Sequence, residues 1–198
     1  MGEGGERFGA SDHLVSEALY LRDPDGLGIE VYADRPRDAW RMRQTPDGPE
    51  LLMATDPLNL ADVVRSAGGE SWDGMPSGTV MGHVHLHVGR LAVAQDFYHR
   101  ALGLDPVVWS YPGALFLSAG GYHHHLGVNT WAGEDATAPD AGDARLVEWT
   151  MLLPEPADVS ATAGRLTSAG YPVVPDPHGW HVSDPWGTVL RVTSGDWR

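Results

Sequence analysis

The sequence predicts an α+β protein built from repeated βαβββ modules, whose strands form a curved, cup-shaped mixed β-sheet with flanking helices. Two long segments each read as one strand, one helix and three further strands. A shorter segment near the start repeats only the closing pair of strands. The 25 glycines and 15 prolines favour short strands joined by turns over a helical bundle.

The first complete repeat opens with the alternating sequence HVHLHV at 83–88, which predicts a strand. Apolar residues then recur at helical spacing along 91–102 and predict a helix with one apolar face. Short apolar runs separated by Pro-Gly and Gly-Gly turns predict three further strands. These strands are expected at 107–111, 114–118 and 125–129.

The second repeat has the same order. Residues 146–153 predict a strand, and residues 158–170 predict a helix. Three more short strands are expected at 171–175, 180–184 and 187–193. The repetition itself predicts the architecture, because each module needs a neighbour to bury its apolar face.

A third copy of the closing hairpin lies at 18–32, where it matches 114–129 and 180–193. We interpret it as the last strands of a module whose first strand and helix are absent. An exposed sheet edge is normally covered or paired. We therefore expect this part to pack against the rest of the chain or a second subunit, and we predict a homodimer.

Turn-rich, charged stretches separate these modules. Between two of them, Asp56 is a candidate N-cap and Pro57 a candidate first residue of a short helix. The predicted organisation is a partial module at 1–34, a linker with a short helix at 35–79, a βαβββ module at 80–132, a linker at 133–144 and a βαβββ module at 145–198.

Composition excludes several functions. With 13 Lys and Arg against 27 Asp and Glu, the formal charge of −14 disfavours binding to nucleic acid or to an anionic membrane. The sequence has no cysteine, so any metal must be held by His, Asp and Glu. No segment reads as a signal peptide or a membrane span, and we expect a cytoplasmic protein.

Alternation along the predicted strands sorts polar from core residues. In HVHLHV the three valine and leucine residues share one face, which places His83, His85 and His87 on the other. The same parity in the strand near 125–129 places His125 on the face opposite the core, together with His123. Three alternating histidines and a Tyr-His-His-His run predict that at least two histidines bind a metal.

Carboxylates share these faces. When the three hairpins are aligned on their turn glycines, Glu30, His125 and Arg191 occupy equivalent positions. Aligning the first strands of the two repeats puts Glu148 opposite His83. Two histidines and one carboxylate form the facial triad of non-heme Fe(II), which we favour, although the same ligands suit Zn, Ni or Mn.

The pattern leaves alternatives open. A lone strand histidine is usually a hydrogen-bonded polar group. Part of the His123 to His125 run could supply the hydrogen bonds that ligating imidazoles need. Four other histidines are read as ordinary polar side chains: His13, His99, His178 and His181.

The repeat, the segment DFYHRALGL, and the segments SAGGYHHHLGVNTW and SEALYLRDPDGLGIEVYADRPRDAW resemble the vicinal oxygen chelate superfamily. That superfamily includes glyoxalase I, bleomycin-resistance proteins and type I extradiol dioxygenases, and the resemblance is to bacterial catechol 2,3-dioxygenase-like proteins of four modules. It implies a metal held by His83 and His125, with Glu30 or Glu148 as the carboxylate.

The resemblance also implies a metal-dependent dioxygenase that acts on a small catechol-like aromatic. His85 or Tyr122 would act as the base that moves protons. Two alternatives are a glyoxalase-like lyase or isomerase that uses a divalent metal, and a non-enzymatic small-molecule binding or resistance protein.

Overall fold

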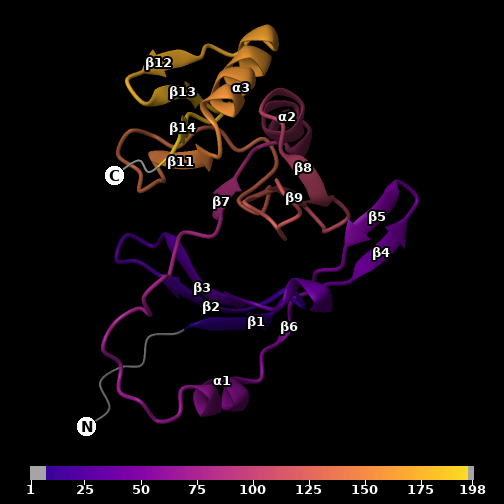
Figure 1. The fold of residues 1–198 in the computed structure, drawn as a ribbon, viewed down its shortest axis with the longest axis vertical. Helices are drawn as coiled ribbons and strands as arrows, with labels where there is room; N and C mark the ends of the chain where they lie inside the picture. Colours follow the sequence, from indigo (N-terminus) through magenta and orange to yellow (C-terminus); the bar gives the residue numbers. More distant parts are fainter. Residues whose placement is uncertain (1–7, 196–198) are drawn as a thin grey trace. The chain divides into compact units, whose positions relative to one another are not determined.

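The computed structural model describes residues 8–195 and confirms the predicted α+β class (Figure 1). The chain divides into two compact units, Met1–Gly82 and His83–Arg198. Within the described residues, no helix combines the length and apolar character that a membrane span requires.

The first unit contains a four-stranded sheet in the order β3-β2-β1-β6, and its neighbouring strands are antiparallel. The hairpin predicted at 18–32 is present as β2 and β3, and the glycine of its turn, Gly26, has a φ of +89°. The strands of this sheet are β1 (Gly9–Asp12), β2 (Ser16–Arg22), β3 (Gly28–Asp34) and β6 (Asp56–Pro57).

The segment predicted as a linker has more structure than expected. A short 3-10 turn, η1 (Arg37–Ala39), precedes a two-stranded hairpin of β4 (Met42–Thr45) and β5 (Gly48–Leu51). The predicted short helix follows as α1 (Leu60–Ser66).

The predicted start of this helix is wrong. Asp56 and Pro57 form β6 and pair with β1, so they lie in the sheet and not in the helix. The N-cap is Asn59, whose side chain accepts a hydrogen bond from the backbone N–H of Asp62. Asn caps a helix about as well as Asp does, and the pairing with β1 holds Asp56 and Pro57 in an extended conformation.

The second unit begins with the first complete module. Its sheet has the order β7-β10-β9-β8, with β7 parallel to β10 and the other pairs antiparallel. The helical segment begins as an α-helix and continues with the wider turns of a π-helix. The elements are β7 (Val84–His87), α2 (Leu91–Ala94), the π-helical η2 (Gln95–Ala101), β8 (Asp105–Val108), β9 (Ala114–Ser118) and β10 (Leu126–Asn129).

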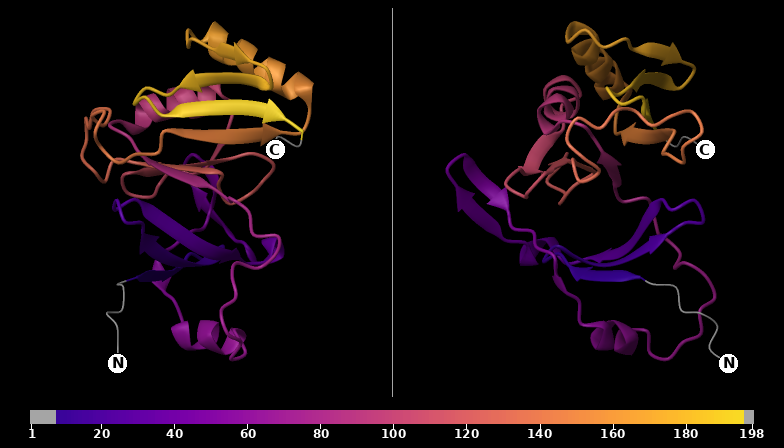
Figure 2. Two further views of the ribbon diagram at one scale, coloured as in Figure 1. Left: turned by 90° about the vertical axis from the view of Figure 1, so that its left-hand side faces the viewer. Right: turned by 180° about the vertical axis from the view of Figure 1, so that it is seen from behind.

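The second module repeats this topology, as predicted. Its sheet has the order β11-β14-β13-β12, and its first and last strands are again parallel. Figure 2 shows α3 lying along this sheet. The elements are β11 (Glu148–Leu153), α3 (Pro156–Ser168), β12 (Val174–Asp176), β13 (Gly179–Ser183) and β14 (Val189–Ser194).

The two modules of the second unit share one core. Buried residues of β7, β9 and β10 form a single cluster with those of α3, β13 and β14. Phe97 in η2 packs edge-on against Tyr171, with ring centroids 4.8 Å apart. The neighbouring Tyr98 is buried and donates a hydrogen bond of 2.6 Å to Asp184, which follows β13. Both contacts join the modules directly.

Candidate metal centre

Strand β7 confirms the predicted alternation of its side chains. Leu86 is buried in the core, whereas His85 and His87 are exposed on the opposite face. The parallel pairing extends to the residue before β10, since the N–H of Val84, the first residue of β7, donates to the His125 carbonyl at 3.0 Å. His83 therefore lies immediately before β7, beside the segment that leads into β10.

The turn before β10 brings two further histidines to the same place. After β9 the chain passes through Gly120 and Gly121, whose φ values of +62° and +69° are left-handed and suit glycine. The chain then bends through His123 and His124 before β10 starts at Leu126. Both histidines are buried, at 1% and 5% exposure. Because this stretch is not a strand, neighbouring side chains need not point to opposite faces.

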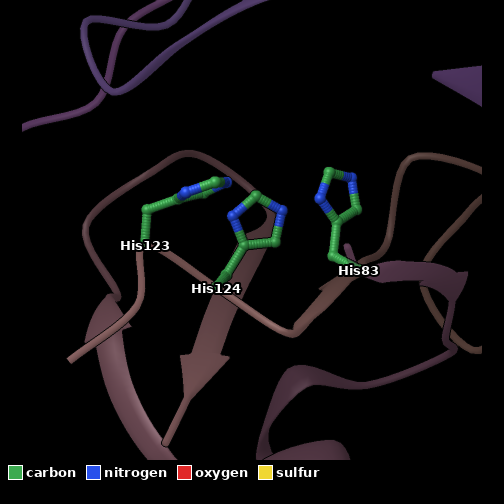
Figure 3. A group of neighbouring side chains, drawn as sticks. All are labelled: His83, His123 and His124. Carbon is green, nitrogen blue, oxygen red and sulfur yellow. The ribbon is translucent and has the colours of Figure 1, made fainter. Parts of the chain in front are cut away.

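His83, His123 and His124 form one cluster (Figure 3). Each offers a ring nitrogen, and the three nitrogens lie within 4.8 Å of one another. The ring centroids of His83 and His124 are 4.2 Å apart, and those of His123 and His124 are 4.7 Å apart. One ion could therefore contact all three side chains after small rotations of the rings.

The donor set fits a divalent transition metal. Imidazole nitrogen suits Zn, Cu, Fe and Ni, and three histidines with open positions form a known type of catalytic site. Three neutral imidazoles leave the charge of the ion uncompensated. That charge can then be used to hold an anionic oxygen of a ligand or to acidify a bound hydroxyl group.

His125, predicted as a ligand, lies next to this cluster with different contacts. Its Nδ1 accepts a hydrogen bond of 3.2 Å from the Ala119 N–H and lies 3.2 Å from the Ser118 hydroxyl. These contacts stabilise the turn after β9. The role of His125 as a ligand stays a prediction.

The two predicted catalytic residues flank the cluster. The Tyr122 ring lies 4.2 Å from that of His123 and 4.9 Å from that of His125, measured between centroids. His85 lies further along β7, with its Nε2 2.7 Å from the Asn129 side-chain nitrogen. The catalytic roles of Tyr122 and His85 stay predictions.

The sequence of the second unit is similar to that of a known family. Residues 80–191, which include the first complete module, most of the second and all three histidines, match the model of the Glyoxalase/Bleomycin resistance protein/Dioxygenase superfamily. The chain belongs to this superfamily. The resemblance seen in the sequence is thereby confirmed.

Two further similarities add detail to the superfamily assignment. The chain is 42% identical over 185 residues to a protein named catechol-2,3-dioxygenase from Bacillus subtilis (strain 168), a match that covers 92% of this chain and 64% of the relative. A glyoxalase/dioxygenase structure from Nostoc punctiforme matches with a TM-score of 0.50 and 14% identity, over 65% of this chain and 100% of that chain. The second similarity shows the fold alone.

Glu148, one of the two carboxylates predicted as metal ligands, forms an ion pair with Arg191. Arg191 binds it through two hydrogen bonds of 3.0 Å, from Nε to Oε1 and from Nη2 to Oε2. Arg191 also contacts Asp176. The hydrogen bonds from Arg191 lower the pKa of Glu148 below its ordinary value, so the carboxylate stays charged and paired. The role of Glu148 as a ligand stays a prediction. In the structure its carboxylate is paired with the Arg191 guanidinium.

Replacing Glu148 by glutamine is expected to leave metal uptake unchanged, because its carboxylate already has a cationic partner and lies outside the histidine cluster. The measurement is the molar ratio of Zn²⁺ to protein after dialysis. Asp176→Asn, which changes the other acidic partner of Arg191, is the matched control. Loss of zinc in Glu148→Gln alone would identify Glu148 as a ligand.

Glu30, the other predicted carboxylate ligand, lies on β3 in the first unit. Its Oε1 accepts a hydrogen bond of 3.0 Å from the Tyr20 hydroxyl. That hydroxyl is 2.5 Å from His13 Nε2, and His13 Nδ1 is 2.6 Å from the carbonyl oxygen of Ala54. The role of Glu30 as a ligand stays a prediction. The association of His13 with Tyr20 and Glu30 was not predicted, although Tyr20 and Glu30 face each other in the β2–β3 register.

Proposed function

We propose that the protein is a divalent-metal-dependent dioxygenase that opens the ring of a small catechol-like aromatic. The observation that carries this proposal is the cluster of half-buried His83 with buried His123 and His124, whose donor set suits Fe(II). The identity with a protein named catechol-2,3-dioxygenase supports the choice of reaction. Because the chain spans 64% of the length of that relative, the activity of the whole relative is proposed here and not transferred.

The reaction is balanced without an external reductant. Both atoms of O₂ enter the product, and the ring carbon–carbon bond beside one hydroxylated carbon breaks. When bound, the metal would supply a Lewis acid that holds the two adjacent oxygens of the substrate and brings O₂ close to them. We assign the metal to His83, His123 and His124, with His125 as the alternative ligand predicted from the sequence.

The surrounding side chains would manage protons and water. A catechol must release hydroxyl protons when it binds a cation. Tyr122, whose ring touches those of His123 and His125, is placed to accept or return one. His85 lies on the face of β7 opposite the core, two residues after His83, and is the second candidate. The burial of His123 and His124 keeps water away from one side of the site.

The test is oxygen uptake by protein reconstituted with Fe(II) under anaerobic conditions and then mixed with a panel of catechols. We expect uptake that depends on both iron and catechol, together with a new absorbance from the ring-opened product. The matched control is His178→Ala, which removes an exposed histidine of the second module and should keep full activity. Absence of uptake by iron-loaded protein across the panel would contradict the proposal.

The donor set also favours one second candidate. Three imidazoles without a carboxylate suit Zn and Ni, which polarise a carbonyl oxygen without using O₂. A glyoxalase-like lyase or isomerase would stabilise an enediolate in this way. Such a protein would convert a hemithioacetal of glutathione under argon when loaded with Zn²⁺ or Ni²⁺. The dioxygenase would not.

The subunit arrangement and location are also proposals. The segment that follows α1 exposes large apolar side chains, with Trp72 at 76%, Val80 at 80% and Met81 at 89% exposure. Apolar surface of this kind is characteristic of contacts between proteins. It supports the predicted homodimer. The predicted cytoplasmic location remains an inference from the composition of the sequence.

A further inference from the structure

A continuous series of ring contacts leads away from the histidine cluster in the second unit. The rings of His83 and His124 are 4.2 Å apart, and the centroid of Phe116 lies 4.9 Å from that of His124. Beyond Phe116 the series divides into two branches. The ring centroid of His85 lies 5.8 Å from that of Phe116, and the ring centroid of Tyr111 lies 6.0 Å from it.

Trp131 closes this series. Its ring lies 5.6 Å from that of His85 and 6.2 Å from that of Tyr111, so the two branches meet at the indole. The indole is 55% exposed. An aromatic side chain that leaves this much apolar surface in contact with solvent, at the end of a series of rings that begins at a candidate metal site, is a candidate for ligand contact.

The position of Trp131 is fixed from two directions. The indole Nε1–H donates to the Pro112 carbonyl at 3.1 Å, and the backbone N–H donates to Asn129 Oδ1 at 3.0 Å. The ring also leaves little room at Gly113, where an added Cβ would lie 3.2 Å from the indole nitrogen. A residue held in this way loses little conformational freedom when a ligand stacks on it.

Asn129 orders the neighbouring histidines as well. Because the Trp131 N–H requires an oxygen, Asn129 Oδ1 must face it, and the amide nitrogen then faces His85. His85 Nε2 therefore accepts a hydrogen bond of 2.7 Å from this amide nitrogen. His87 Nδ1 donates to the same oxygen at 2.7 Å. Asn129 is 2% exposed, so the amide at the centre of this arrangement is shielded from water while the two histidines reach the surface.

The backbone makes room for the His85 ring. At Gly127, which pairs with His85 across β7 and β10, a Cβ atom would lie 3.0 Å from the His85 Nδ1. Glycine at this position lets the imidazole lie flat against the strand. The side chain is thus positioned both from below, by Gly127, and from one edge, by Asn129.

We propose that Trp131, with His85 and Tyr111 beside it, forms a platform on which the aromatic ring of the substrate stacks while its hydroxyl groups point toward the histidine cluster. This inference rests on the proposed function and adds a binding site for the substrate ring. The ligand class is a planar aromatic, whose ring stacks on the indole face.

Binding of 4-nitrocatechol to zinc-loaded protein tests the platform, since Zn²⁺ does not turn the compound over and the nitrocatechol absorbance reports binding. Trp131→Ala is expected to weaken this binding about tenfold, and Trp131→Phe to restore most of it, because a ring remains. The Zn²⁺ affinity should be the same in all variants. Trp72→Ala, which removes an exposed tryptophan of the first unit, is the matched control and should bind as the unmodified protein does.

Each outcome decides the proposal. Equal affinity of Trp131→Ala and the unmodified protein for 4-nitrocatechol would overturn the platform and leave the proposed dioxygenase activity untouched. Absence of binding by the unmodified zinc-loaded protein would also overturn it. If Trp131→Ala loses the ligand but the iron-loaded unmodified protein consumes no oxygen, the platform stands and the proposed reaction fails. Circular dichroism confirms that the variants are folded, and Trp131→Phe keeps the test valid if the alanine variant is not.

Discussion

Replacing His124 by alanine is expected to lower the affinity for Zn²⁺ at least ~100-fold, because one of three ligands is lost and the other two cannot close a site. His83→Ala should have the same effect. The two histidines come from different places in the fold, the entrance of β7 and the turn before β10. Loss of Zn²⁺ affinity in both variants would show that the two elements bind one ion. Isothermal titration with ZnCl₂ and elemental analysis after dialysis measure this affinity.

His125→Ala is the informative comparison. Its Nδ1 accepts a hydrogen bond from the backbone of Ala119, so we expect a small change in stability and retention of zinc. His178→Ala should behave as the unmodified protein. If His125→Ala abolished zinc binding while His124→Ala kept it, the ligand set predicted from strand alternation would hold and the cluster in Figure 3 would not.

Replacing Asp184 by alanine is expected to lower the free energy of unfolding by about 3–5 kcal/mol, because three donors lose their acceptor at once. The carboxylate accepts from the Tyr98 hydroxyl at 2.6 Å and from the backbone N–H groups of Trp186 and Thr188, each at 2.9 Å. Tyr98→Phe removes one of these bonds and should cost about 1–3 kcal/mol. Urea denaturation followed by tryptophan fluorescence measures both.

The same hydrogen bond predicts a dependence on alkaline pH. Burial raises the pKa of the Tyr98 phenol well above its ordinary value, and the charge of Asp184 raises it further. Above about pH 10 the unfolded chain loses this proton whereas the folded chain keeps it, so the free energy of unfolding falls by up to ~1.4 kcal/mol per pH unit. Below that pH the bond contributes fully. Tyr98→Phe should remove this part of the slope.

Tyr171→Phe is the control for both measurements. Its ring contacts Phe97, next to Tyr98 in the chain, and it should keep the alkaline slope of the unmodified protein. An identical slope in Tyr98→Phe and Tyr171→Phe would contradict the assignment of the alkaline transition to Tyr98.

Much of the fold could be predicted because local pattern and tertiary structure agree. The ALFLS run forms β9 over the residues expected, Ala114–Ser118, and the exposed His85 and His87 follow from the alternation in β7. The β4–β5 hairpin was not predicted, because its sequence mixes Pro, Gly and charge without a period. The helix start at Asp56 failed because pairing with β1 is a long-range contact that a local capping signal does not include.

The candidate site was predicted in part. Alternation identifies the face that carries His85 and His87, and the Tyr-His-His-His run marks the second element. The pairing of His83 with His124 could not be derived, since parity applies within a strand and β10 begins only at Leu126. Before that residue the chain bends, and both His123 and His124 turn inward. Adjacent buried histidines after a Gly-Gly turn are the signal that points to such a cluster.

The three histidines also have a consequence for the folding of a chain that contains no cysteine. They lie at the two ends of a stretch that includes the helix and three strands, β7, β8 and β9, of the first complete module. An ion that bound them would cross-link this stretch as a disulfide does, closing a loop of roughly 40 residues. By chain entropy alone such a closure disfavours the unfolded state by about 4 kcal/mol. Metal supply would then set the lifetime of the folded protein as well as its chemistry.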